Sequence, residues 1–171
     1  MTTLHGALVR LRPLTTADRS RVREILATPE VSRWWGDPDR EADDLVDEDD
    51  EDITVYAIEF GGETVGVIQS VEDNDLQYRQ AGIDIAVHAD WHGRGIGSDA
   101  IRTLAGHLFA SGHHRLTIDP SAANETAIRV YRGLGFRPVG ILRQYELGTD
   151  GVYHDGLLMD LLVGELTERA V

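Results

Sequence analysis

A glycine-rich segment in the middle of the chain has the residue types of a phosphate-binding turn. It stands between a run typical of a strand and a run typical of a helix, and its residues are His92, Gly93, Arg94, Gly95, Ile96, Gly97 and Ser98. Glycines leave main-chain N–H groups uncovered, and the N-terminus of the following helix adds a positive field that favours an anion. Arg94 adds a cation. The segment therefore predicts a phosphate site, with a purely structural tight turn as the alternative.

Two common nucleotide motifs do not account for this turn. A Walker loop requires a lysine, and the 171-residue sequence contains none. A dinucleotide fingerprint accepts Ala100 as its third small residue, but it also needs an acidic residue about twenty positions further on, where Asp119 falls only loosely. We therefore expect a different kind of phosphate ligand.

The charge of the chain is strongly acidic and unevenly distributed. The net charge is −14, from 30 acidic residues and 16 basic residues that are all arginine. Residues 1–78 carry −12, residues 79–143 carry +3 and residues 144–171 carry −5, and the acidic segment 37–52 alone supplies −10. Nucleic acid is excluded as a partner, because duplex binding needs a basic surface. The distribution favours an anionic cofactor and a cationic small molecule, although a charge run such as 43–52 is more often a solvated surface.

The chain offers little to a metal, a disulfide or a membrane. It has no cysteine, and its seven histidines form no His-x-x-x-His pair, since His113 and His114 are adjacent and point apart. The acidic segment fails as an EF-hand because Asp52 occupies the glycine position and Ile58 the twelfth. No stretch approaches the roughly 18 apolar residues of a membrane span. We expect no metal, no membrane association and a cytoplasmic location.

These residues must be positioned by the elements around them, and the hydrophobic pattern predicts a single α/β domain over residues 1–171. The expected strands cover 8–13, 53–60, 63–71, 81–88, 115–118, 137–145 and 152–162. The expected helices cover 15–28, 101–109 and 124–132, while 34–38 and 73–80 are expected as loops. In the strand 81–88 the apolar Ile83, Ile85 and Val87 alternate with Asp84, which places this carboxylate on the opposite face.

The second half of the chain resembles the GNAT superfamily of acetyl-CoA-dependent N-acetyltransferases. The family's pyrophosphate turn, Gln/Arg-x-x-Gly-x-Gly/Ala, is matched by residues 92–97 except that His92 replaces Gln/Arg. A second signature about thirty residues further on is matched at Asn124, Ala127, Tyr131, Gly135 and Phe136. The resemblance implies one mixed, mostly antiparallel twisted sheet flanked by helices on both faces, with acetyl-CoA as cosubstrate.

Within that superfamily the chain looks most like the aminoglycoside 6'-N-acetyltransferases. The segments that carry this likeness are 34–36, 67–70, 82–84, 117–121, Asn124 and 127–131, of which Asp119-Pro120-Ser121 is the most distinctive. Beyond Phe136 the likeness fades, and the ending Tyr153–Asp160 is more similar to GNAT proteins that acetylate protein N-termini or are uncharacterised.

The resemblance assigns a role to each candidate residue. Asp84 would hold the acceptor ammonium and take its proton, although an ordinary Asp pKa of ~3.9 makes it a poor base. Tyr131 would donate a proton to the departing thiolate, Asn124 would contact the pantetheine arm, and a main-chain N–H around Val87 would stabilise the oxyanion. The acceptor side would include Trp34, Trp35 and Asp119. The structural alternatives are a helix cap for Asn124, core packing for Tyr131 and the tryptophans, and a solvent-facing role for Asp84.

The leading hypothesis is an N-acetyltransferase that moves acetyl from acetyl-CoA to a primary amine of a small polycation, with the 6'-amine of an aminoglycoside as the first candidate. Alternatives are another amine, such as a polyamine, a siderophore-pathway lysine derivative or a protein N-terminus, and a non-catalytic acidic module that binds a basic protein. Homodimers are common in the family, and Val152–Leu162 is a candidate edge for pairing.

Overall fold

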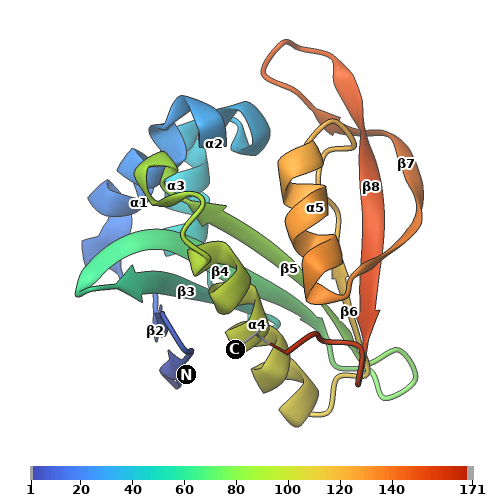
Figure 1. Ribbon diagram of the computed structural model, residues 1–171. Coiled ribbons are helices and arrows are strands. Elements are labelled where there is room, and N and C mark those ends of the chain that lie inside the picture. The colour runs from blue at the N-terminus through green and yellow to red at the C-terminus, as the bar shows by residue number, and fades with distance from the viewer. Residues whose placement is uncertain (1, 169–171) are drawn as a thin grey trace.

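The strands form one open mixed sheet in a computed structural model that describes residues 2–168 (Figure 1). The sheet order is β1-β2-β3-β4-β5-β6-β8-β7, and every neighbouring pair is antiparallel except β5 and β6. The strands are β1 Leu4–His5, β2 Arg10–Pro13, β3 Ile53–Phe60, β4 Glu63–Asp73, β5 Gln80–Val87, β6 Arg115–Ile118, β7 Arg137–Leu147 and β8 Tyr153–Leu162. The predicted fold class, a mixed and mostly antiparallel sheet, is confirmed.

Helices cover both faces of this sheet. They are α1 Arg19–Ala27, α2 Pro29–Trp35, α3 Pro38–Val46, α4 Ile96–Ala110 and α5 Glu125–Leu134. Leu26 of α1 and Leu45 of α3 pack on Ala86, whereas α4 and α5 share a second apolar cluster with Ile83. Since Ile83 and Ala86 have opposite parity on β5, the two clusters lie on opposite faces. Figure 1 shows α1–α3 grouped at one end of the sheet and α5 lying along β6 and β8.

The first helical segment begins where the sequence predicts. Thr15 and Asp18 form a reciprocal capping box around the 3₁₀ turn Thr16–Asp18, and α1 follows directly. No helix in the described part of the chain is long and apolar enough to cross a membrane.

The predicted loop Trp34–Pro38 is wrong. Both tryptophans belong to α2. This helix ends at Gly36, whose φ is +88°, and α3 begins at Pro38. The reason is a pair of helix starts. Thr28 precedes Pro29 at the start of the short α2, and Asp37 accepts N–H groups of α3 ahead of Pro38. The acidic segment 37–52 therefore contains a helix whose Ala42 and Leu45 are buried.

The parallel pair at the centre of the sheet is short. β5 and β6 pair only from Gln80 with Arg115 to Gly82 with Thr117. Beyond Gly82 the rest of β5 pairs with β4, and Ile118 pairs with Met159 of β8. The two halves of the sheet therefore separate beyond this point and leave a wedge between them.

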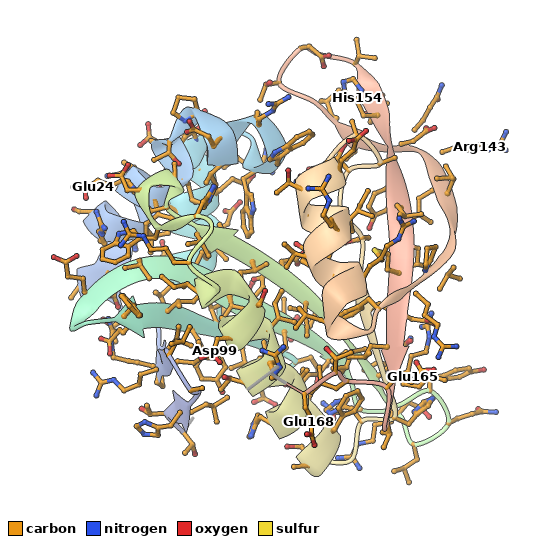
Figure 2. The ribbon with its side chains drawn as sticks, in the orientation of Figure 1. Glu24, Asp99, Arg143, His154, Glu165 and Glu168 are labelled. Atoms are coloured by element: carbon orange, nitrogen blue, oxygen red, sulfur yellow. The ribbon has the colours of Figure 1, made fainter. Side chains whose placement is uncertain are left out.

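A buried carboxylate fixes the start of α4 against the first strands. Asp99, labelled in Figure 2, lies in the first turn of α4 and is 3% exposed. Its Oδ2 accepts the main-chain N–H groups of Leu8 at 2.7 Å and Val9 at 3.0 Å. These bonds satisfy the buried charge and attach the glycine-rich turn to the N-terminal hairpin.

Candidate active site

A cavity of about 1120 Å³ occupies the wedge between β5 and β6. One side is formed by residues 83–87 of β5, by α2 and by the glycine-rich turn, and the other by residues 118–121, α5 and β7. The cavity therefore brings together most of the residues that the sequence singles out, from segments far apart in the chain.

The glycine-rich turn presents main-chain groups to this cavity. Gly93 and Gly95 have φ of +73° and +77°, a region that glycine adopts without strain. The first helical bond of α4 runs from the Asp99 N–H to the Gly95 carbonyl at 3.0 Å. The N–H groups of Ile96, Gly97 and Ser98 therefore precede the helical ladder and are free to bind an anion.

Arg94 is placed away from these N–H groups. Its guanidinium lies over the Trp91 ring, 4.7 Å from the ring centroid, and it lines a separate hollow of about 560 Å³ rather than the main cavity. The candidate anion site is thus built from main chain, and the Arg94 side chain is not brought into it.

His92 and Val87 interact at the edge of the wedge. The His92 Nε2 lies 2.6 Å from the carbonyl oxygen of Val87, so this ring nitrogen donates the hydrogen. On the next residue, the His88 N–H donates to Val65 of β4. Because successive amides of a strand point to opposite edges, the Val87 N–H points away from β4 and toward the wedge.

Asp84 lines the cavity, and its side chain points to the face of β5 opposite to that of the core residue Ile83. Gln69, its direct partner on β4, donates a hydrogen bond of 3.0 Å from Nε2 to Asp84 Oδ2. Burial raises the pKa of Asp84 above its usual value, the nearby charge of Asp119 adds to this, and the Gln69 amide partly opposes it. Asp84 is therefore a stronger base than an ordinary aspartate.

Tyr131 and Asn124 face the same cavity from α5. Tyr131 is 8% exposed, and its burial, reinforced by the charges of Asp84 and Asp119, raises its pKa well above the usual range, so the phenol stays protonated. Asn124 caps α5, because its Oδ1 accepts the Ala127 N–H at 3.2 Å. Asn124 therefore acts as a helix cap through its side-chain oxygen, and its side-chain NH₂ is left to contact a ligand.

The two tryptophans contribute differently to the same wall. The Arg33 guanidinium lies over the Trp34 ring, with its Cζ 4.5 Å from the ring centroid. Trp35 is partly buried against the apolar cluster on the α1–α3 face. Both also line the cavity.

The acidic segment contributes one residue to the cavity. Of residues 37–52, which the structure describes throughout, Glu41 alone lines it. Asp43 and Asp47 instead form ion pairs with Arg19 of α1. Residues 43–52 therefore lie outside the cavity lining, and two of their carboxylates form ion pairs with α1.

Two cavity residues on β7, Tyr145 and Glu146, were not predicted from the sequence. The Tyr145 hydroxyl donates a short hydrogen bond to Asp119 Oδ2, which raises the pKa of Tyr145 to about 12. Burial raises the pKa of Glu146, and the charges of Asp119 and Asp84 raise it further. The sequence predicts a strand up to Tyr145, but no local signal shows that Tyr145 and Glu146 face the cavity.

Six acidic residues line the cavity, and four of them lie close enough to interact by charge. These are Glu146 and the three residues whose charges add to burial in raising its pKa, Asp119, Asp84 and Glu41. Within residues 2–168 no group of three or more His, Cys, Asp or Glu side chains is arranged to hold a metal ion. The arrangement suits an organic cation beside a main-chain anion site.

Known proteins share this architecture and sequence pattern. A family model described as Acetyltransferase (GNAT) family matches residues 19–136. Spermidine N(1)-acetyltransferase of Escherichia coli K12 is 29% identical over 158 residues, covering 88% of this chain and 84% of that protein. Aminoglycoside N(6')-acetyltransferase type 1 of Klebsiella pneumoniae is 29% identical over 154 residues, covering 77% and 75% respectively. A Vibrio cholerae spermidine N-acetyltransferase, solved with CoA and spermine, superposes with a TM-score of 0.80 at 20% identity, covering 94% of this chain and 98% of that chain.

Proposed function

Because the chain belongs to the GNAT acetyltransferase family, we propose that it transfers acetyl from acetyl-CoA to a primary amine of a small polycation, with the 6'-amine of an aminoglycoside as the leading acceptor. Family membership confirms the predicted acetyltransferase class with acetyl-CoA as cosubstrate. The identity of the amine is the proposed part.

The glycine-rich turn at the edge of the wedge suits the anionic part of acetyl-CoA, its pyrophosphate. The N–H groups of Ile96, Gly97 and Ser98 would hold the pyrophosphate, aided by the positive end of α4. A side chain at Gly95 would be strained by its φ of +77°, in keeping with a turn selected for uncovered main chain. Asn124 lies farther along the same cavity, where its amide would contact the pantetheine. When bound, acetyl-CoA supplies the thioester that is attacked.

The residues around the thioester have complementary proton chemistry. Asp84 would hold the acceptor ammonium and take its proton, which frees the nitrogen lone pair to form the new carbon–nitrogen bond. The Val87 N–H would donate to the acetyl carbonyl oxygen as negative charge develops there. Tyr131 would donate its proton to the sulfur as the carbon–sulfur bond breaks. The attacking nitrogen would lose its second proton to solvent as the carbonyl re-forms. Asp84 would release the proton it took and Tyr131 would regain one, so the products are the acetamide, the free CoA thiol and one proton.

The observation that carries the acceptor assignment is the group of carboxylates on both sides of the cavity. Asp84 comes from β5, whereas Asp119 and Glu146 come from the other half of the sheet. Burial is the main cause of the raised pKa values of Asp84 and Glu146, and the charge of Asp119 raises both further; a bound polycation would oppose this repulsion. Trp34 and Tyr145 add aromatic surfaces on which a sugar ring can stack. A wide, acidic and partly aromatic cavity favours a ring-containing polyamine such as an aminoglycoside.

A linear polyamine is the second candidate. The similarity to spermidine N(1)-acetyltransferase extends over more of this chain than the similarity to the aminoglycoside enzyme. The same carboxylates could bind the ammonium groups of a linear chain, without use of the aromatic surfaces.

A thiol-release assay tests the proposal. The protein with acetyl-CoA is offered kanamycin, tobramycin, spermidine, spermine or a peptide with a free N-terminus, and release of CoA thiol is measured. We expect release with the aminoglycosides and a KM that rises steeply with salt, since the attraction is between opposite charges. Release with spermidine alone would assign the linear acceptor, and release with the peptide alone would refute a polycationic substrate.

A variant pair links the acceptor to the carboxylates. Asp119→Asn should raise KM for the acceptor about tenfold with little change in KM for acetyl-CoA. Asp75→Asn is the matched control, because Asp75 is an exposed aspartate that accepts only a local N–H, from Gln77. An Asp119→Asn protein with an unchanged KM would remove Asp119 from the acceptor site.

A further inference from the structure

The hairpin of β7 and β8 contains a bulge beside the cavity. Leu142 pairs with Gly156, and Glu146 pairs with His154, so Arg143, Gln144 and Tyr145 all lie opposite the single residue Asp155. Gln144 has a φ of +49° and is the one non-glycine among residues 2–168 with a positive φ. Such a conformation persists where the surroundings hold it in place. Figure 2 labels Arg143, the first residue of the bulge, and His154, the partner of Glu146 at its end.

The bulge determines where two cavity residues point. In a regular strand, consecutive side chains point to opposite faces of the sheet. Tyr145 and Glu146 are consecutive, yet the Tyr145 hydroxyl donates to Asp119 and the charge of Asp119 also acts on Glu146. The extra residues opposite Asp155 therefore let β7 present a phenol and a carboxylate to one site.

Asp155 holds this bulge and the neighbouring loop together. Its Oδ1 accepts the Gln144 N–H at 2.8 Å, and its own carbonyl oxygen accepts the Ala122 N–H at 2.8 Å. The next residue, Gly156, forms a bridge with Ser121. Asp155 thus lies between the bulge that carries Tyr145 and the segment that carries Asp119.

Tyr145 completes the connection to the cavity. Its ring lies against Gly156, where an added Cβ would be 2.9 Å from the Tyr145 Cδ1, and its hydroxyl donates to Asp119 Oδ2. The contacts run in order from Asp155 to Gln144, then to Tyr145, and from Tyr145 to Asp119.

We propose that Asp155 is a positioning residue for the amine-acceptor site, acting through the Gln144 N–H to keep Tyr145 on Asp119. Asp155 does not line the cavity and contacts no reacting group. Its carboxylate determines instead how the acceptor side is shaped. The inference rests on the proposed function only for the identity of the amine. The contacts between Asp155, Gln144, Tyr145 and Asp119 do not depend on the proposed function.

Steady-state kinetics test this role, using the amine that the thiol-release assay identifies. Asp155→Ala should raise KM for the amine about tenfold, with KM for acetyl-CoA unchanged within about twofold. Asp155→Asn should restore the wild-type KM, because it keeps the accepting oxygen. The matched control is Asp75→Ala, in the loop after β4, where the carboxylate likewise accepts one main-chain N–H, from Gln77 at 2.8 Å; it should leave both KM values unchanged.

A double variant separates positioning from general stabilisation. If Asp155 acts through Tyr145, the combination Asp155→Ala with Tyr145→Phe should cost no more than Tyr145→Phe alone. Multiplied effects of the two substitutions, or equal increases in both KM values, would overturn the inference.

A titration makes the test independent of the acceptor. In protein labelled with ¹³C at tyrosine Cζ, with Tyr145→Phe used to assign the resonance, wild-type Tyr145 should remain mostly protonated at about pH 10.5. In Asp155→Ala it should ionise near the ordinary value of about 10, because the bond to Asp119 is lost. If the wild-type protein acetylates no amine, the proposed function fails while this titration still decides the placement. If the pKa of Tyr145 is the same in Asp155→Ala as in the wild-type protein, the positioning role of Asp155 is refuted.

Discussion

Gln69 and Asp84 are direct partners in the β4–β5 ladder, and the Gln69 side-chain amide donates a hydrogen bond of 3.0 Å to Asp84 Oδ2. Two opposing influences therefore act on one carboxylate. Burial favours the protonated form of Asp84, and the amide favours the charged form. The pair sets the pH at which Asp84 can accept a proton.

Gln69→Leu should move the acid limb of the pH–rate profile to higher pH. Loss of the amide removes a bond to the carboxylate, so the already raised pKa of Asp84 rises further. The measurement is kcat/KM against pH. Gln77→Leu, in the exposed loop after β4, should leave the limb in place, and an unmoved limb in Gln69→Leu would mean that Asp84 does not control it.

Tyr131→Phe should lower kcat about 100-fold while both KM values change little. The substitution keeps the packed ring and removes only the proton donor. Because burial holds the pKa of Tyr131 far above its usual value, the wild-type protein should show no alkaline limb from this group below about pH 10. Tyr153→Phe, which changes a side chain 58% exposed, is the control and should keep full activity. Full activity in Tyr131→Phe would assign Tyr131 to the core alone.

Gly95→Ala should weaken acetyl-CoA binding and lower stability. The added Cβ meets only Leu8 Cδ1 at 3.7 Å, so the cost comes from the φ of +77° and should be about 1–2 kcal/mol. The displaced N–H groups should also raise KM for acetyl-CoA and reduce the rise in Tm that acetyl-CoA produces. Gly106→Ala in the same helix has open space around its Cβ and should raise stability by about 0.5–1 kcal/mol. Normal acetyl-CoA binding by Gly95→Ala would exclude the turn as the anion site.

Asp18→Asn should make stability less dependent on pH. Both terminal nitrogens of the Arg12 guanidinium bond to Asp18 at 2.8 Å, which holds the pKa of Asp18 below its usual value. This contribution is present above the unfolded pKa of about 3.9 and is lost as pH falls through the lower folded value. The variant should lose about 1.5–3 kcal/mol at pH 7 and much less near pH 2, measured by urea unfolding.

Glu24→Gln is the control for this effect. Glu24, labelled in Figure 2, pairs with Arg21 while 63% exposed, so its loss should cost well under 1 kcal/mol at either pH. An equal loss for Asp18→Asn at both pH values would show that its charge does not matter.

Sequence patterns predicted the elements whose signals are local. The hairpin 53–60 and 63–71 was recognised from Gly61-Gly62, and the observed strands end at Phe60 and Asp73. The helix starting after Asn124 was also recognised, because a cap and an apolar face lie within ten residues. The helix α3 was missed because the eleven acids in Asp37–Asp52 obscured the start at Pro38, and α2 was missed because its seven residues are too few to show a helical apolar period.

The acceptor side was less predictable because it depends on contacts between distant segments. Asp84 could be placed on one face of its strand from alternation alone. Tyr145 could not, since it reaches the cavity only through a bulge whose Gln144 is held by Asp155, eleven residues further on. The role expected for Arg94 likewise depended on a rotamer that the stacking partner Trp91 fixes.

The short parallel pairing of β5 and β6 also leaves part of a strand edge unpaired. Three residue pairs join these two strands, so beyond Gly82 the edge of β5 that faces β6 has no strand partner among residues 2–168. The Val87 N–H lies on this edge. An extended ligand in the wedge can therefore bond to β5 as an additional strand would, and these main-chain contacts do not depend on side-chain identity.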